Sequence, residues 1–126
     1  MSEYERLGKL LLEGGRVPEI EIGGRAFKLS ERQQNFVSNF KDRFCLYSGG
    51  YGCGKSLALY LKLVLFVKCF PNNRVLLGRR TLADIERAIL PDLFELMPKA
   101  WYEHRVKDAV INLRNGSQII LFGLDA

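Results

Sequence analysis

A run of residues from Gly49 to Ser56 has the types and the spacing needed to bind a chain of phosphates. It matches the phosphate-loop pattern G-x-x-x-x-G-K-S/T in full and reads Gly49-Gly50-Tyr51-Gly52-Cys53-Gly54-Lys55-Ser56. Glycines lack the Cβ atoms that would keep backbone N–H groups from closing around an anion. We expect Lys55 to contact the β- and γ-phosphates and the Ser56 hydroxyl to be a ligand for Mg²⁺. The motif therefore predicts a bound nucleoside triphosphate with Mg²⁺.

The sequence on both sides of this motif has the pattern that a phosphate loop requires, a strand before it and a helix after it. The apolar run 44–47 leads into Ser48 and the glycines, which is typical of a buried parallel strand. Residues 56–68 contain neither Gly nor Pro and are almost continuously apolar. They predict a helix that is buried on most faces and stops near Pro71. These flanks favour a phosphate loop over the alternative, a glycine-rich turn that matches by chance.

The composition is that of one globular domain, with 126 residues, 48% of them hydrophobic and 26% charged. Lys62 and Lys68 interrupt the longest apolar run, which argues against a membrane span, and no secretory signal pattern opens the chain. Three cysteines without paired spacing suit a reducing cytoplasm, and with a single histidine they predict no zinc site. The formal charge of +5 allows either a nucleic-acid partner or a basic surface that binds nothing.

Before the phosphate loop, the sequence predicts a short amphipathic helix, a hairpin and a second helix. Residues 7–12 are amphipathic, residues 19–22 alternate at strand period, and residues 26–29 follow a Gly-Gly turn as the return strand. Ser30 has the type and position of a helix N-cap, and Gln33 follows at the spacing of a capping box. We expect that helix to continue towards residue 40.

After the phosphate loop, the sequence predicts a strand over residues 74–78 and then a helix that starts at Thr81. Pro91 should kink or restart this helix, and Pro98 should end it. Further along, two alternating apolar runs flank Asn115-Gly116, which is the strongest short-range signal for a hairpin.

These elements predict an α/β protein of the P-loop NTPase class, with a RecA/ASCE-like parallel-sheet core and an added β-hairpin. We expect residues 1–29 to be an N-terminal extension and residues 30–126 to be a partial P-loop ATPase domain. Such enzymes need an acidic residue on another strand, the Walker B strand, to hold Mg²⁺ through water. No apolar run that ends in an acidic residue follows Phe122, and Asp125 stands alone. The chain is therefore expected to be truncated before that strand.

The order of these features resembles the ATPase domain of bacteriophage terminase large subunits, the motors that package viral DNA into capsids. The likeness spans roughly residues 29 to 125 and lies in four segments, residues 29–36 (LSERQQNF), 49–56, 78–81 (GRRT) and 115–125 (NGSQIILFGLD). Each flanking segment alone is weak evidence for the resemblance, but the order and spacing of the segments make the likeness moderately specific. The clustered carboxylates of the family's nuclease domain are absent from this chain.

The resemblance implies that the nucleotide is ATP and assigns further roles. Gln33 or Gln34 would contact adenine, although Gln33 is equally well explained by the capping box. Tyr51 stands where many relatives carry an arginine inside the loop. Arg79 or Arg80 would then supply a cation as an arginine finger, or would instead cap the strand end or contact DNA phosphates.

The resemblance also implies partners and a location. The whole protein would hydrolyse ATP to translocate double-stranded DNA through backbone contacts. It would act as a homo-oligomeric ring with a portal and a small terminase subunit, in the cytoplasm of an infected bacterial cell. This chain alone would lack turnover, because the acidic strand is missing. A helicase-type or other RecA-like P-loop ATPase that acts on nucleic acid, and a nucleotide-binding fragment without turnover, remain as alternatives.

Overall fold

The computed structural model describes residues 3–40 and 55–124, without the side chains of Lys55 and Ser56. The predicted strand 44–47 and residues Gly49 to Gly54 of the phosphate loop lie outside the described residues. The chain divides into two compact units, Met1–Leu65 and Phe66–Ala126, and the division falls inside helix α3 (Lys55–Cys69). Both units combine helices with strands, so the protein is of the mixed α/β class.

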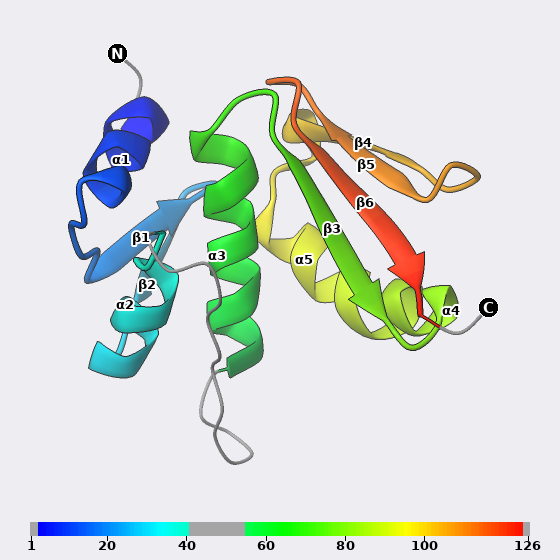
Figure 1. The fold of residues 1–126 in the computed structure, drawn as a ribbon, viewed down its shortest axis with the longest axis horizontal. Helices are drawn as coiled ribbons and strands as arrows, with labels where there is room; N and C mark the ends of the chain where they lie inside the picture. Colours follow the sequence, from blue (N-terminus) through cyan, green and yellow to red (C-terminus); the bar gives the residue numbers. More distant parts are fainter. Residues whose placement is uncertain (1–2, 41–54, 125–126) are drawn as a thin grey trace. The chain divides into compact units, whose positions relative to one another are not determined.

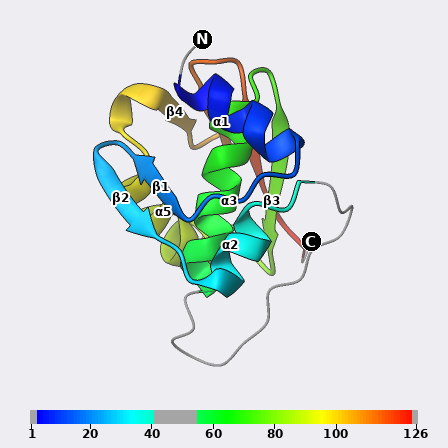
Figure 2. The same cartoon turned by 90° about the vertical axis from the view of Figure 1, so that its left-hand side faces the viewer.

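The first unit opens with helix α1 (Glu3–Leu12) and a two-stranded antiparallel sheet of β1 (Glu19–Ile22) and β2 (Arg25–Lys28), as Figure 2 shows. The turn between the strands consists of two glycines with positive φ angles, 58° and 84°, which favour residues without a Cβ atom. Along β1 the isoleucines are buried and the glutamates are exposed, because successive side chains of a strand point to opposite faces. The predicted hairpin is confirmed.

Two helices complete this unit, α2 (Glu31–Val37) and the larger part of α3. Ser30 is the N-cap of α2, as predicted, but the helix ends at Val37 with Ser38 as its C-cap and does not reach residue 40. The predicted helix 56–68 is confirmed as α3, whose 15 residues include neither Gly nor Pro. Much of α3 is buried, which agrees with its almost continuous apolar sequence.

The second unit contains a four-stranded sheet in the order β3-β6-β5-β4 (Figure 1). Its strands are β3 (Arg74–Arg79), β4 (Tyr102–Arg105), β5 (Val110–Leu113) and β6 (Gln118–Gly123). β3 and β6 are parallel, whereas β6 with β5 and β5 with β4 are antiparallel. The described sheet is therefore mixed, and the predicted hairpin is observed as β5–β6, with β6 as the parallel neighbour of β3. The sequence did not predict β4.

A helical segment with a π-helical centre connects β3 to β4. Thr81 caps its start by accepting a hydrogen bond from Asp84 N at 3.1 Å, and the helix passes through α4 (Leu82–Asp84), η1 (Ile85–Ile89) and α5 (Leu90–Leu96). The π-helical segment η1 lies just before the proline at position 91, whose missing N–H prevents a regular α-helical bond there. Pro91 was predicted to kink or restart this helix, and the restart is observed, since α5 begins at Leu90 with the proline in its first turn. The predicted end before Pro98 is confirmed.

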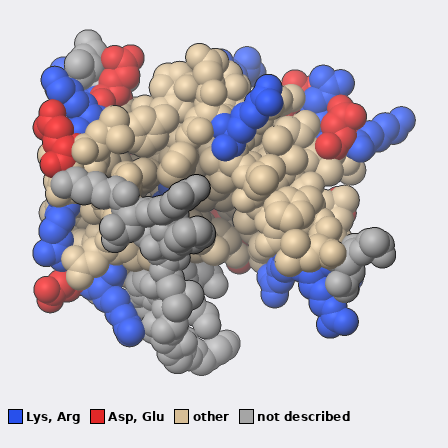
Figure 3. All heavy atoms as spheres, viewed as in Figure 1, with Lys and Arg blue, Asp and Glu red and all other residues tan. Residues whose placement is uncertain are grey.

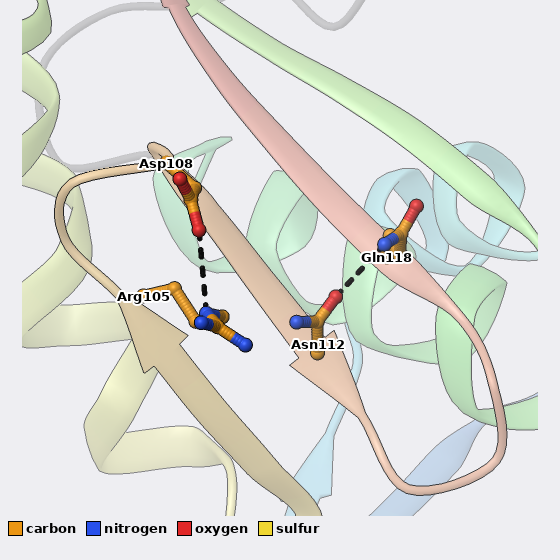
Figure 4. Close-up of polar contacts among 4 residues, drawn as sticks. All are labelled: Arg105, Asp108, Asn112 and Gln118. Atoms are coloured by element: carbon orange, nitrogen blue, oxygen red, sulfur yellow. Dashed lines mark hydrogen bonds and ion pairs between the residues drawn. The ribbon is translucent and has the colours of Figure 1, made fainter.

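The two faces of this sheet differ in burial. On one face the side chains of β5 and β6 are buried and those of β3 and β4 are half-buried. α5 covers part of this face, since the Phe94 ring stacks on Tyr102 at a centroid distance of 4.8 Å. On the other face Leu76 is 66% exposed and Phe122 is 37% exposed. Polar pairs also lie along β5 and its neighbours, where Gln118 donates to Asn112 at 2.9 Å and Arg105 pairs with Asp108 at 3.3 Å (Figure 4).

The turn of the β5–β6 hairpin is tied to the carboxyl end of α3. Asn115 Nδ2 donates to the carbonyl oxygens of Val67 at 2.8 Å and Lys68 at 3.3 Å, and Ser117 Oγ donates to the Phe70 carbonyl at 3.0 Å. The last carbonyl groups of a helix receive no hydrogen bond from within the helix. The Asn115 and Ser117 side chains donate hydrogen bonds to carbonyl groups at this end, which would otherwise need water as a donor. Residues more than forty positions away in the chain thus cap α3.

Candidate functional site

Lys55 and Ser56, the last two residues of the phosphate-loop motif, are the first two residues of α3 as described. The first backbone N–H groups of a helix have no intrahelical acceptor, and the helix dipole places positive partial charge at the same end. A helix that starts at the Lys-Ser pair of this motif is the context in which the motif binds phosphate. The start of α3 is therefore suited to bind an anion. Residues 49–54 of the phosphate loop lie outside the described residues.

Gln33 forms the capping box that its spacing predicts. Its Oε1 accepts a hydrogen bond from Ser30 N at 3.0 Å, and Ser30 Oγ accepts one from Gln33 N at 3.2 Å. The Gln33 side chain is buried, with 9% of its surface exposed. The capping box uses one of the two lone pairs of this Oε1, and burial limits access to the other.

Gln34 is differently placed, on the next position of the same helical turn. Its Nε2 donates to the Leu29 carbonyl at 3.0 Å, and the side chain is half-buried. In the part of the chain that the structure describes, no hydrogen bond to its Oε1 is formed. An amide held through one donor, with its oxygen still able to accept, has the chemistry to meet an exocyclic amino group such as that of adenine.

Lys62 joins the helix that carries both glutamines to the helix that starts at Lys55. Its Nζ donates to the carbonyl oxygens of Phe36 at 2.7 Å and Asn39 at 2.6 Å. The same ammonium lies 4.6 Å from the Phe36 ring centroid and 5.3 Å from that of Phe40. Phe36 is in the last turn of α2, where the helix dipole favours a cation. No local pattern around Lys62 indicates this role, because the carbonyl groups that it contacts lie more than twenty residues away in the chain.

Arg79 and Arg80 lie in the other unit, at the carboxyl end of β3. Arg79 is the last residue of the strand and pairs with Gly123 of β6, and its carbonyl accepts from Leu124 N at 2.8 Å. Both arginines are exposed. A Cβ atom on Gly123 would approach Leu82 N to 2.8 Å, so only glycine fits where the end of β6 meets the start of α4. The structure thus brings Gln33 and Gln34 together in one unit and places the two arginines in the other.

Charged side chains lie towards the margins of the face that Figure 3 shows, and broad areas without Lys, Arg, Asp or Glu lie between them. A cavity of about 320 Å³ lies in the first unit between the loop after α1 and the end of α2. It is lined by Gly14, Gly15, Arg16, Asn35, Ser38, Asn39 and Phe40. Neither glutamine of the candidate site lines it.

Other reactive groups in the described part of the chain are few and separated. No group of three or more His, Cys, Asp or Glu side chains there is arranged to hold a metal ion. Burial raises the pKa of the Cys69 thiol to about 12, so the thiol stays protonated and unreactive at neutral pH. His104 Nε2 is buried without a hydrogen-bond partner among the described residues, beside the Phe94 ring. No helix of the described residues is long and apolar enough to cross a membrane.

Searches of protein families, of curated proteins and of solved structures found no match to this chain. The candidate site therefore depends on the sequence motif and on the geometry of the described residues. Two features carry it. One is the phosphate-loop sequence that ends where α3 begins, and the other is the helix α2, which bears the two glutamines and whose Phe36 carbonyl accepts a hydrogen bond from Lys62 of α3.

Proposed function

We propose that this chain is the ATP-binding portion of a terminase-type motor, which uses ATP hydrolysis in the whole protein to translocate double-stranded DNA. The observation that carries the proposal is the complete phosphate-loop motif whose Lys55 and Ser56 stand at the start of the 15-residue helix α3. The strand β3, which follows α3 and pairs in parallel with β6, is compatible with a sheet of the P-loop class.

In this proposal the residues of the chain bind and orient ATP. Lys55 contacts the β- and γ-phosphates, the first N–H groups of α3 face them, and Ser56 supplies a hydroxyl oxygen of the kind that Mg²⁺ prefers. Bound Mg²⁺ would neutralise charge on those phosphates. We assign the adenine contact to Gln34 in preference to Gln33, because Gln33 is buried with its oxygen in the capping box, whereas Gln34 is half-buried.

The DNA partner is proposed from charge and from the resemblance to packaging motors. A formal net charge of +5 favours contacts with the phosphate backbone of DNA, which do not depend on the base sequence. Arg79 and Arg80 are exposed cations at the end of β3 and can serve such contacts or act as an arginine finger. The proposal also includes the homo-oligomeric ring and the infected bacterial cytoplasm of the resembled family.

The nucleotide part of the proposal is tested by thermal unfolding with and without Mg²⁺-ATP. A ligand at about one hundred times its Kd stabilises the folded state by about 2.7 kcal/mol, so the wild-type melting temperature should rise clearly. Lys55→Ala should remove that rise, while Lys28→Ala, which changes an exposed lysine of β2, should keep it. A wild-type melting temperature that millimolar Mg²⁺-ATP leaves unchanged would refute ATP binding by this chain.

The DNA part is tested separately by fluorescence anisotropy with short duplexes of unrelated sequence. Affinity should be the same for each duplex and should fall steeply as salt is raised, because counterion release dominates backbone binding. An Arg79→Ala, Arg80→Ala double variant should weaken binding to every duplex to a similar extent. Absence of binding at low salt would remove DNA as a direct partner of this chain and leave ATP binding intact.

A further inference from the structure

Several segments of the second unit meet at the end of the sheet where β3 and β6 begin. The parallel pairing of these strands sets Arg74 beside Gln118. The start of β4 lies at the same end, since Arg114 N donates to the Trp101 carbonyl at 2.9 Å. The β5–β6 turn, which caps the carboxyl end of α3, completes this end of the unit (Figure 1).

Basic side chains gather on the segments that meet at this end. The Lys68 ammonium lies 4.3 Å from the Trp101 ring centroid, and Trp101 is the last residue of the short helix η2 (Lys99–Trp101). Arg114 Nε donates to the Ala100 carbonyl of the same short helix. The four cations at this end, which we call the basic end, are Lys68, Arg74, Lys99 and Arg114.

The charge of the basic end is not balanced by acids. All of the cations except Lys68 form no ion pair in the described part of the chain, whereas at the opposite end of the sheet Arg105 pairs with Asp108. The acids Glu95 and Glu103 lie just outside the segments that meet here. Those segments contain the four cations and no Asp or Glu, and they are residues 66–74, 97–102 and 113–118. This end of the unit is therefore positively charged.

The width of the basic end suits a partner with a row of phosphates. Neighbouring strands are about 4.8 Å apart, so the three spacings from β3 to β4 spread these segments over about 14 Å. Each strand of duplex DNA presents one phosphate about every 3.4 Å of helix axis, so this width corresponds to about four nucleotides. Cations without ion pairs can contact those phosphates without first losing an intramolecular partner.

We propose that the basic end is a contact surface for the sugar-phosphate backbone of duplex DNA. This inference rests on the DNA part of the proposed function, and it uses no residue of the phosphate loop. The surface is separate from the arginines at the carboxyl end of β3, because five residues of strand place Arg74 and Arg79 about 17 Å apart. Contacts of this kind fix the position of the duplex and do not read its base sequence.

The experiment measures Kd for a short duplex by fluorescence anisotropy on the full chain, over a series of NaCl concentrations. A Lys99→Gln, Arg114→Gln double variant should weaken binding about tenfold and reduce the slope of log affinity against log salt by about 2, because two phosphate contacts are lost. An Arg87→Gln, Lys107→Gln double variant is the matched control. It removes the same charge from exposed residues of η1 and of the β4–β5 turn, and it should keep the wild-type slope and a Kd within about twofold of wild type.

Each other result has a defined meaning. Equal losses of affinity in the two double variants would overturn the basic end as a contact surface, while DNA binding stands. Wild type that binds no duplex at low salt would refute the DNA part of the proposed function and this inference with it. Wild type that binds phosphatidylserine vesicles and no duplex would overturn it in favour of a membrane surface.

A second variant covers the case in which the first fails to fold by circular dichroism. Arg74→Gln, Lys99→Gln then replaces it, because both side chains are exposed and form no hydrogen bond or ion pair in the described part of the chain. A wild-type Kd and salt slope in this folded variant would overturn the inference.

Discussion

Replacing Asn115 with alanine should destabilise the protein more than its half-exposed position in a hairpin turn suggests. The side chain caps the carboxyl end of α3 through Val67 and Lys68, at 2.8 and 3.3 Å, and its Oδ1 accepts from Ser117 N at 3.0 Å. Alanine removes all three hydrogen bonds and leaves two helix carbonyls without these donors. The turn and the end of the helix would both lose a restraint.

The expected loss can be worked from these three contacts. A neutral hydrogen bond contributes about 1 kcal/mol net, and the 3.3 Å bond should contribute less. The sum is a decrease of about 2 kcal/mol in the free energy of unfolding. With a urea m-value of about 1.5 kcal/mol/M, the midpoint should fall by about 1.3 M. Asn115→Asp should lose more, because a carboxylate would face two carbonyl oxygens and the negative end of the helix dipole.

Urea unfolding followed by circular dichroism and by Trp101 fluorescence gives the measurement, and coincident transitions check that one free energy describes both signals. Asn112→Ala is the matched control in the same hairpin, since Asn112 makes one side-chain bond, to Gln118 at 2.9 Å (Figure 4). It should cost about 0.5 kcal/mol. If Asn115→Ala costs no more than Asn112→Ala, the capping of α3 by this turn does not stabilise the fold as we describe.

Three further predictions concern single sites. Gly116→Ala should lower the free energy of unfolding by at least about 1–2 kcal/mol in urea titrations, because φ is 91° and the new Cβ would overlap Asn72 Oδ1; a neutral effect would contradict this turn geometry. Ser30→Ala should cost about 1 kcal/mol in the same titration through loss of the α2 N-cap, and no loss would argue against the capping box. Burial raises the pKa of the Cys69 thiol from 9.0 to about 12, so at pH 8 the thiol should resist iodoacetamide until urea unfolds the chain. Peptide mass spectrometry measures the labelling, and rapid labelling of the native protein would contradict the burial of Cys69. Because that pKa is raised, the stability from protonated Cys69 should be complete below pH 9 and decline as pH rises towards 12.

Local signals in the sequence predicted the elements whose partners are neighbours in the chain. The Ser30–Gln33 capping box, the Thr81 cap and the Asn115-Gly116 hairpin are each formed within a few residues, so the residue types and their spacing are sufficient. The restart of the helix at Pro91 was likewise predictable, because proline removes a backbone donor wherever it stands in a helix.

Pairings between distant residues were not predictable in this way. The strand β4 (Tyr102–Arg105) has a polar sequence, and it is a strand because β5 offers it a hydrogen-bonded edge. The parallel pairing of β3 with β6 joins segments 44 residues apart. A local sequence pattern can predict a strand, but it does not predict the strand with which it pairs. The sequence therefore predicted the β5–β6 hairpin but not the parallel pairing of β6 with β3 or the antiparallel pairing of β4 with β5.

For the candidate site, the sequence alone determined the phosphate-loop motif and the helix after it, because the chemistry of phosphate binding fixes adjacent residue types. The tertiary structure decided what those types cannot: that the Gln33 oxygen is already bonded, that Gln34 keeps an accepting oxygen among the described residues, and that Lys62 joins α2 to α3. These outcomes depend on which carbonyl groups come within hydrogen-bond distance when helices pack. Packing depends on all the side chains of the unit, so the spacing of residues along the chain does not predict it.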